Sequence, residues 1–207
     1  MNVHHPNSND PITFFDALQL HFKLGSDPSL LFHCLHVVKV AKQILEQLPP
    51  TVLVDRDLVL IGALLHDIGR NRTQGIGHAV AGSEIILEVF PVNNFTNDLA
   101  KIIASHIGGG IPKEEAKELG LPEKDFIPET IEERIVCYAD KMVDYTFNKS
   151  SSNYEIKKWF TFSSVDNEIN KLASKLGKNH PAINRLRQLE SNLVSMNNNR
   201  PFRFNDK

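Results

Sequence analysis

Apolar residues recur at helical spacing through most of the 207-residue chain, and this period limits the possible folds more than any other feature. Across residues 29–48 they return every three or four positions, which predicts an amphipathic helix that the proline at position 49 ends. Residues 55–66 are apolar nearly all round, as in a helix at the centre of a bundle. Sustained β-type alternation is absent. The pattern therefore predicts an all-α helical bundle.

Prolines, glycines and polar runs mark the limits of further helices. We expect helices at residues 11–24, 78–90, 95–106 and 112–120, another that begins after Pro128, and a C-terminal helical extension at 154–196. The last residues, NNNRPFRFNDK, are expected to form a loose tail. A chain of this length fits a single domain, residues 1–207, better than two.

Composition narrows the class of protein. The chain has 23 Lys and Arg against 25 Asp and Glu, so its net charge of -2 gives no general field for binding nucleic acid. No apolar run reaches the roughly 18 residues that a membrane helix needs, and the polar N-terminus does not resemble a signal peptide. Cys34 and Cys137 lie in apolar helical stretches and form no disulfide framework. We expect a soluble, cytoplasmic protein with no membrane partner, and a homo-oligomer is possible.

Certain histidines and aspartates stand within apolar helical stretches or at their ends: His33, His66, Asp67, His78, His106 and Asp140. Divalent metals of the borderline kind take mixed imidazole and carboxylate sites, and a group of this size would suit two ions that share a carboxylate. Adjacent residues on a regular helix point in different directions, so His66 and Asp67 can face one ion only at a distorted helix end. Gly69 is expected to supply that distortion.

The order of these residues resembles the HD superfamily of metal-dependent phosphohydrolases. The sequence words that carry the likeness are FHCLHVVKVA, GALLHDIGR, GHAVAGSEI, ASHIGGGIP and CYADKMVD, and it covers about residues 25–147. It implies an HD-domain helical bundle over this core. Within the superfamily, the stretch from SHIGGGIP to CYADK is similar to small archaeal HD proteins, a group that includes the enzyme that opens dihydroneopterin 2′,3′-cyclic phosphate.

The resemblance also implies a ligand for each position of the metal centre. It makes His33, His66, Asp67 and Asp140 the ligands of a first metal, and His78 and His106 the ligands of a second, with Asp67 bridging the two. The two additional histidines separate phosphodiesterase-like members with two ions from members with one. Iron or manganese is the favoured metal, with cobalt, nickel, magnesium or zinc as alternatives.

The implied activity is hydrolysis of a small nucleotide-like or pterin-like phosphoester, a cyclic phosphodiester in the first place, by a metal-activated hydroxide. Asp67 and Arg70 are the candidate catalytic residues. Four basic residues are candidates for binding the phosphorylated substrate: Arg70, Arg72, Lys113 and Lys141. The chain contains no Walker loop, dinucleotide fingerprint or nucleophile elbow, which removes the usual anchors of a kinase, a dehydrogenase or an acyl hydrolase.

Alternative functions stay open on the sequence alone. One is a dinucleoside polyphosphate hydrolase or a nucleoside monophosphate phosphatase. Another is an HD-type diiron oxygenase that uses the same ligands, and a third is a non-catalytic, nucleotide-binding regulator. Of the other histidines, His36 is expected to pack beside the site, whereas His4, His5, His21 and His180 are expected at the surface.

Overall fold

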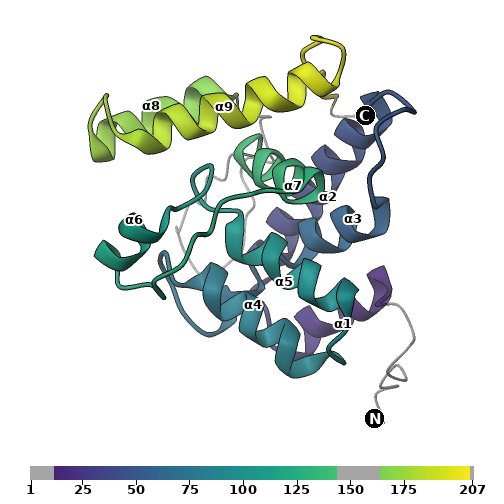
Figure 1. The fold of residues 1–207 in the computed structure, drawn as a ribbon. Coiled ribbons are helices and arrows are strands. Elements are labelled where there is room, and N and C mark those ends of the chain that lie inside the picture. The colour runs from purple at the N-terminus through teal and green to yellow at the C-terminus, as the bar shows by residue number, and fades with distance from the viewer. Residues whose placement is uncertain (1–11, 144–163, 206–207) are drawn as a thin grey trace, which may run out of the picture.

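The computed structural model describes residues 12–143 and 164–205, and within these ranges the chain is built from helices (Figure 1). They are α1 (Phe14–Lys23), α2 (Pro28–Gln47), α3 (Arg56–Leu65), the 3₁₀ turn η1 (Ile68–Asn71), α4 (His78–Val89), α5 (Asn94–Ser105), α6 (Lys113–Glu118), α7 (Ile131–Lys141), α8 (Val165–Leu176) and α9 (Pro181–Met196). The predicted all-α bundle with a C-terminal helical extension is confirmed. The first part of that extension, residues 154–163, lies outside the described ranges.

Short-range signals set the helix boundaries. The Asp27 side chain accepts a hydrogen bond from the amide of Ser29, Pro28 occupies the first turn of α2, and the helix ends ahead of Pro49. The Thr130 hydroxyl starts α7 in the same way. Each cap satisfies an amide that has no partner inside its helix. None of the described helices has both the length and the apolar character needed to cross a membrane.

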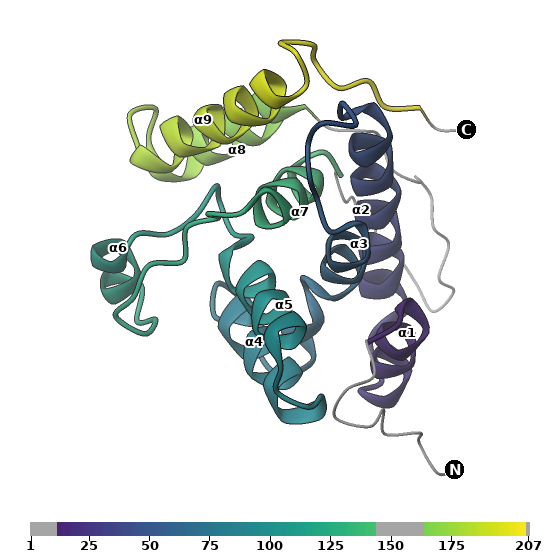
Figure 2. The same ribbon diagram turned by 45° about the vertical axis from the view of Figure 1, so that its right-hand side comes forward.

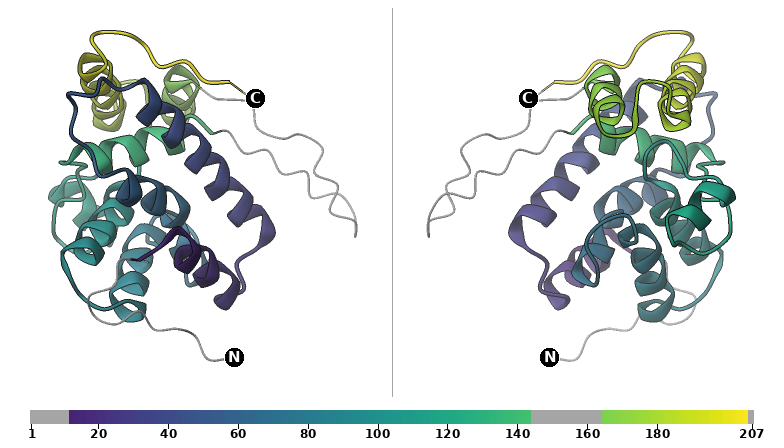
Figure 3. Two further views of the ribbon diagram at one scale, coloured as in Figure 1. Left: turned by 90° about the vertical axis from the view of Figure 1, so that its right-hand side faces the viewer. Right: turned by 90° about the vertical axis from the view of Figure 1, so that its left-hand side faces the viewer.

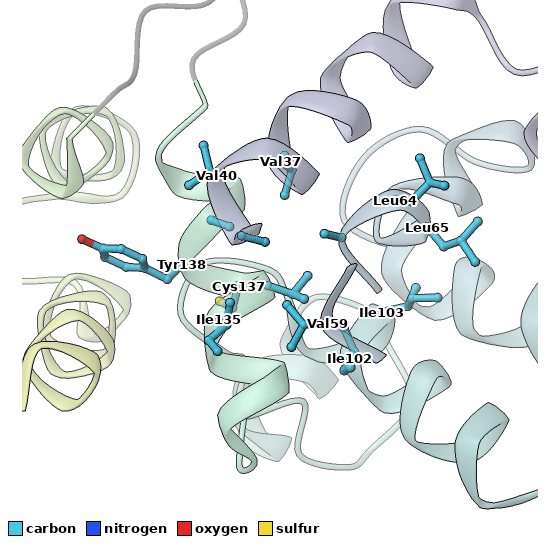
Figure 4. Packing of buried hydrophobic residues seen from close by; sticks show 14 of the residues in the cluster. Val37, Val40, Val59, Leu64, Leu65, Ile102, Ile103, Ile135, Cys137 and Tyr138 are labelled. Carbon is cyan, nitrogen blue, oxygen red and sulfur yellow. The ribbon is translucent and has the colours of Figure 1, made fainter. Parts of the chain in front are cut away.

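The main core lies where α2, α3, α5 and α7 pack against one another. Figure 4 shows side chains of all four helices meeting there, among them Val37, Val59, Ile103 and Ile135. All four are fully buried, and burial of such a side chain contributes about 1.5–3 kcal/mol. Outside this layer, α1 packs on α3, and α4 packs on α5 and η1.

The C-terminal extension covers α7. Helices α8 and α9 lie side by side in all four ribbon views (Figures 1, 2 and 3). Leu186 and Leu193 of α9 are fully buried in the main core cluster. Tyr138 points from α7 towards the extension (Figure 4), and its hydroxyl donates to Glu190 at 3.3 Å. The extension is therefore packed on the helix that carries Asp140.

The expectation of a loose C-terminal tail is wrong for the residues that the structure describes. Beyond α9 the chain returns to the end of α2 (Figure 2). The Gln47 side-chain amide donates to the carbonyl of Arg203 at 2.9 Å and accepts from its N–H at 2.8 Å. Gln43 pairs with Asn205 in the same way, at 3.0 and 2.8 Å. Phe202 is buried in the main core. These contacts hold the end of the chain on α2.

Candidate metal centre

The side chains predicted to bind metal come together from separate elements. The structure places His33 on α2, His66 directly after α3, Asp67 directly before η1, His78 at the start of α4, His106 directly after α5 and Asp140 in the last turn of α7. Their ligand atoms form three overlapping groups whose members lie within 4.8 Å of one another: His33, His66 and Asp67; His66, His106 and Asp140; and Asp67, His78 and His106.

A change of backbone geometry presents His66 and Asp67 to the same place. α3 ends at Leu65, and Asp67, with φ −100° and ψ 8°, already departs from the α conformation. Gly69 also meets a steric need that the sequence did not indicate. A Cβ there would lie 1.9 Å from the carbonyl oxygen of His78 and 2.4 Å from the nearest backbone nitrogen of α4. Only glycine allows η1 to lie this close to α4, which brings Asp67 to His78.

The Asp67 carboxylate stands between two groups of imidazoles. Its Oδ1 is 2.8 Å from Nε2 of His78 and 3.6 Å from Nε2 of His106. Its Oδ2 is 3.7 Å from Nε2 of His66 and 3.9 Å from Nε2 of His33. Asp140 lies with the latter pair, its Oδ1 3.1 Å from His33 and 3.4 Å from His66. We call these the first half (His33, His66 and Asp140) and the second half (His78 and His106) of the centre.

Backbone hydrogen bonds determine which nitrogen of three of the imidazoles carries the hydrogen when the ring is neutral. The Nδ1 atoms of His66, His78 and His106 each meet the carbonyl oxygen three residues earlier, at 2.8, 2.5 and 2.7 Å. A carbonyl can only accept, so each Nδ1 carries a hydrogen, and Nε2 of the neutral ring has a free lone pair. Nε2 of His78 lies 3.1 Å from Nε2 of His106. Facing lone pairs at that distance suit a cation that both can bind.

Two buried polar atoms support the same interpretation. Among the described residues, Nε2 of His66 and Oδ1 of Asp67 have no hydrogen-bond partner. A buried polar atom without a partner costs about 1–3 kcal/mol. Coordination of a divalent ion would satisfy both atoms. The donor set of neutral imidazoles and carboxylates therefore fits a metal centre.

The electrostatics of the cluster favour bound positive charge. Burial alone would raise the pKa of Asp67, but the nearby imidazoles, His66 above all, hold it well below its ordinary value. Burial opposes ionisation of Asp140 too, and the Lys141 ammonium with the adjacent imidazoles again lowers the pKa. Burial alone would lower the pKa of His66, yet Asp67 raises it well above the ordinary value. For His106, burial lowers the pKa to about 4, so the ring is in its neutral, metal-binding form.

Two of the four basic residues predicted to bind substrate lie at the centre. Arg70 Nε donates to Asp67 Oδ2 at 2.7 Å, and the Arg70 side chain is 36% exposed. Lys141 Nζ donates to Asp140 Oδ2. Each carboxylate of the centre is thus paired with one cation, which offsets its charge.

The other two basic residues have different surroundings. Nη1 and Nη2 of Arg72 contact the Glu88 carboxylate in an ion pair at the surface. Lys113 is exposed at the start of α6, and its backbone amide donates to Asp125 at 2.8 Å. The predicted role of both side chains in substrate binding stays a prediction.

His21 is a residue that sequence reasoning missed. The expectation that it lies at the surface is wrong, because it is only 1% exposed. Its Nε2 donates to the carbonyl of Leu64 at 2.9 Å, and its Nδ1 accepts from the Ser26 hydroxyl at 2.9 Å. It therefore caps the end of α3, two residues before His66. The sequence did carry a signal for this burial. His21 follows Ala17 by one helical turn, and Ala17 lies on the buried side of α1.

The remaining histidines lie apart from this cap. His36 is half-buried on α2, and its Nδ1 donates to the Phe32 carbonyl at 2.8 Å. His180 is half-buried and caps α9 through its Nδ1. His4 and His5 fall outside the described residues.

Comparison with known proteins gives a family and three informative relatives. The HD domain family matches residues 30–143. An uncharacterized protein of Methanocaldococcus jannaschii is 41% identical over 174 residues, which are 84% of this chain and 92% of the relative. The tRNA (cytidine(56)-2'-O)-methyltransferase of Picrophilus torridus is 46% identical over 119 residues, 58% of this chain and 33% of the relative. The enzyme of that name from Thermoplasma volcanium is 42% identical over 126 residues, 61% of this chain and 35% of the relative.

The extent of each match decides what it supports. This chain spans only about a third of the length of the two methyltransferases. The activity in their names is therefore a property of those proteins and is not transferred to this chain. No solved structure matches. The family match covers more than half of the chain and includes all six clustered residues, and the Methanocaldococcus relative is similar over nearly its whole length. The chain therefore belongs to the HD domain family, and this domain implies a metal-dependent phosphohydrolase.

Proposed function

We propose that this protein is a phosphodiesterase that uses two metal ions to hydrolyse a small nucleotide-like or pterin-like phosphoester. The observation that carries the proposal is the position of Asp67, whose Oδ1 faces His78 and whose Oδ2 faces His66. A carboxylate with imidazoles on both sides is the arrangement that a pair of divalent ions requires.

Each half of the centre would hold one ion, and Asp67 would be shared. The mixed set of imidazoles and carboxylates favours iron or manganese, with cobalt, nickel, zinc or magnesium as alternatives. Ions bound there would lower the pKa of coordinated water and offset charge on the phosphoryl oxygens.

The protein's own side chains would orient and balance the site. Arg70 is exposed enough to reach solvent while it contacts Asp67, so its guanidinium can also bind a phosphoryl oxygen of the substrate. Lys141 keeps Asp140 in its ionised form. His66, His78 and His106 are almost completely buried, and carbonyl groups fix the directions of their rings. The ligands are therefore placed before any ion binds.

The choice of a phosphodiester rests on the second half of the centre. Among proteins that this sequence resembles, a second pair of histidines accompanies phosphodiester hydrolysis, and His78 and His106 supply that pair. The names of two relatives make tRNA a further substrate to test, for example a fragment that ends in a 2′,3′-cyclic phosphate. The net charge of -2 offers no general support for binding a long nucleic acid.

The test combines metal counting with a panel of phosphoesters. Protein purified without chelator and without oxygen is analysed for metal, reloaded with Fe²⁺ or Mn²⁺, and assayed on cyclic phosphodiesters, dinucleoside polyphosphates and nucleoside monophosphates. We expect two ions per chain and fastest hydrolysis of a cyclic phosphodiester, with no need for dioxygen and no activity after chelation. A single ion or cleavage of monoesters alone would refute the proposal. Turnover that requires dioxygen would indicate the oxygenase, and binding without turnover would indicate the regulator.

A further inference from the structure

The second half of the centre is flanked by a small lobe, residues 107–126, that contains α6. The lobe has an apolar core of its own, formed by Ile111, Ala116 and Phe126 and separate from the main core. Ile111 and Phe126 also pair through their backbones, with N–H to carbonyl distances of 3.0 and 2.8 Å. These contacts make the lobe a distinct packing unit beside the bundle.

The lobe packs against residues that flank both histidines of the second half. Ile76 and Val80, which stand on either side of His78 in the sequence, contact its core, and so does Ala104, two residues before His106. Within the described residues, this apolar cluster includes no side chain of α2, α3 or α7, the helices that position the first half. Displacement of the lobe would therefore disturb the second half before the first.

Arg185 fastens the lobe to α9. Its Nε donates to the carbonyl of Gly110 at 2.8 Å, and its Nη2 donates to Glu115 Oε2 at 2.7 Å. The side chains of Arg185 and Glu115 are only 19% and 23% exposed. Figure 2 shows the segment with α6 beneath the α8 and α9 pair. A planar guanidinium that binds a carbonyl and a carboxylate together holds both in a fixed relation.

The glycine loop after His106 lies directly against the backbone of α9. At Gly109, φ is +79°, and a Cβ there would lie 3.0 Å from the nitrogen of Leu186. On the other side, the Cys137 thiol donates to the carbonyl of His106 at 3.2 Å. The segment that follows His106 is thus held between α7 and α9.

We infer that Arg185 is a positioning residue for the second half of the centre. By holding Gly110 and α6 against α9, it keeps His106 at the distance from His78 at which both can bind one ion. This inference rests on the proposed two-ion centre. It assigns the C-terminal extension a part in metal binding, although none of the six clustered residues comes from it.

Metal titration of matched variants tests this role. Arg185→Gln removes the guanidinium and its charge. Arg185→Lys keeps the positive charge but lacks the planar guanidinium that donates to two acceptors. Glu115→Gln removes the charge of one partner. Arg187→Gln is the control, because Arg187 is exposed on the same helix. Metal-free protein is titrated with Mn²⁺ by calorimetry, and electron paramagnetic resonance records the coupling between neighbouring ions.

We expect the parent and Arg187→Gln to bind two coupled ions. In Arg185→Gln the first ion should bind as in the parent, and the second should bind about tenfold or more weakly, as when a contact behind a ligand is lost. Arg185→Lys and Glu115→Gln should show smaller losses at the same ion. If Arg185→Gln does not fold, Arg185→Lys and Glu115→Gln test the inference, again by weaker binding of the second ion with unchanged binding of the first.

Two results would overturn the inference while leaving the proposed function intact. One is unchanged binding of both ions in Arg185→Gln. The other is an equal loss for both ions together with a lower melting temperature of the metal-free protein, since a purely structural contact would not act selectively. A parent protein that binds one ion would instead defeat the proposed function, and the inference with it.

Discussion

His78 and His106 face each other through their Nε2 atoms at 3.1 Å, while the opposite nitrogen of each ring meets a backbone carbonyl. Two neutral imidazoles in this orientation place lone pairs against each other. A proton or a metal ion between them removes the repulsion. Because burial lowers the pKa of His106 to about 4, a proton on that ring is costly near neutral pH, and the pair suits a metal ion.

His106→Ala should therefore remove one ion and keep the fold. The main core does not depend on this ring, so the circular dichroism spectrum should match that of the parent. Elemental analysis should find one ion per chain where the parent has two, and hydrolysis should slow by about 100-fold or more, above the range for loss of a contact behind a ligand. His180→Ala removes an imidazole at the start of α9 and should keep the parent stoichiometry. Equal metal content in His106→Ala and the parent would indicate a centre with one ion.

Asp67→Asn should be more damaging, because Asp67 is the group that both halves share. The substitution keeps the size of the side chain but removes its negative charge, so each ion loses a carboxylate ligand and Arg70 loses its ionic partner. We expect less than one tightly bound ion per chain and a fall in kcat/KM of about 100-fold or more. Steady-state kinetics on the best phosphoester, at saturating Mn²⁺, measures this effect. Near-normal turnover in Asp67→Asn would contradict a metal mechanism.

Local signals in the sequence predicted much of the fold. The predicted end of the C-terminal extension at residue 196 agrees with the structure, in which Ser164 caps α8 and Pro181 begins α9. The six clustered residues could also be located, because each interrupts or ends an apolar stretch whose burial the helical period reveals. Where a helix begins and ends, and which of its sides is buried, depend mainly on nearby residues, so the sequence can indicate them.

Contacts between distant segments could not be predicted in this way. The helical period on α2 gave no sign that Gln43 and Gln47 would bind the backbone of the last residues, more than 150 positions away. The sequence also did not show that Arg72, close behind His66 and Asp67 in the chain, would pair with Glu88. Charged and amide side chains choose partners through tertiary structure, and their spacing in sequence does not encode the choice.

The different surroundings of Arg70 and Arg72 lead to a comparison of two variants. Arg70→Ala should retain both ions and raise KM about tenfold or more, the loss expected for a charged hydrogen bond of about 1.5–3 kcal/mol. Arg72→Ala breaks only an exposed ion pair that solvent screens, and should change kcat/KM little. Measurement of KM and kcat for both variants distinguishes the two residues. A larger rise in KM from Arg72→Ala than from Arg70→Ala would indicate that Arg72, and not Arg70, binds the substrate.

His21 leads to a prediction about stability that does not involve metal. Its neutral ring donates to Leu64 and accepts from Ser26, and the Ser26 hydroxyl in turn receives a hydrogen bond from Asn71 at 2.9 Å. His21→Ala removes the donor from the end of α3 and should cost about 1–3 kcal/mol of the free energy of unfolding. His21→Gln has an amide that can still donate to Leu64, so it should lose less. Urea unfolding of chelator-treated protein measures both changes.

The same residue should make the parent protein less stable in mild acid. Burial lowers the pKa of His21, with partial compensation from its bond to Leu64, so in the folded state the ring stays neutral below 6.5, the value for an exposed histidine. The unfolded chain then binds more protons than the folded one, and the free energy of unfolding falls as pH drops below 6.5 towards the folded pKa. His21→Gln does not titrate at this position, so the stability advantage of the parent over His21→Gln should shrink between pH 7.5 and pH 5.5. Other titrating groups are common to both proteins and cancel in the difference. An advantage that stays constant or grows over this range would mean that His21 is not held neutral at the end of α3.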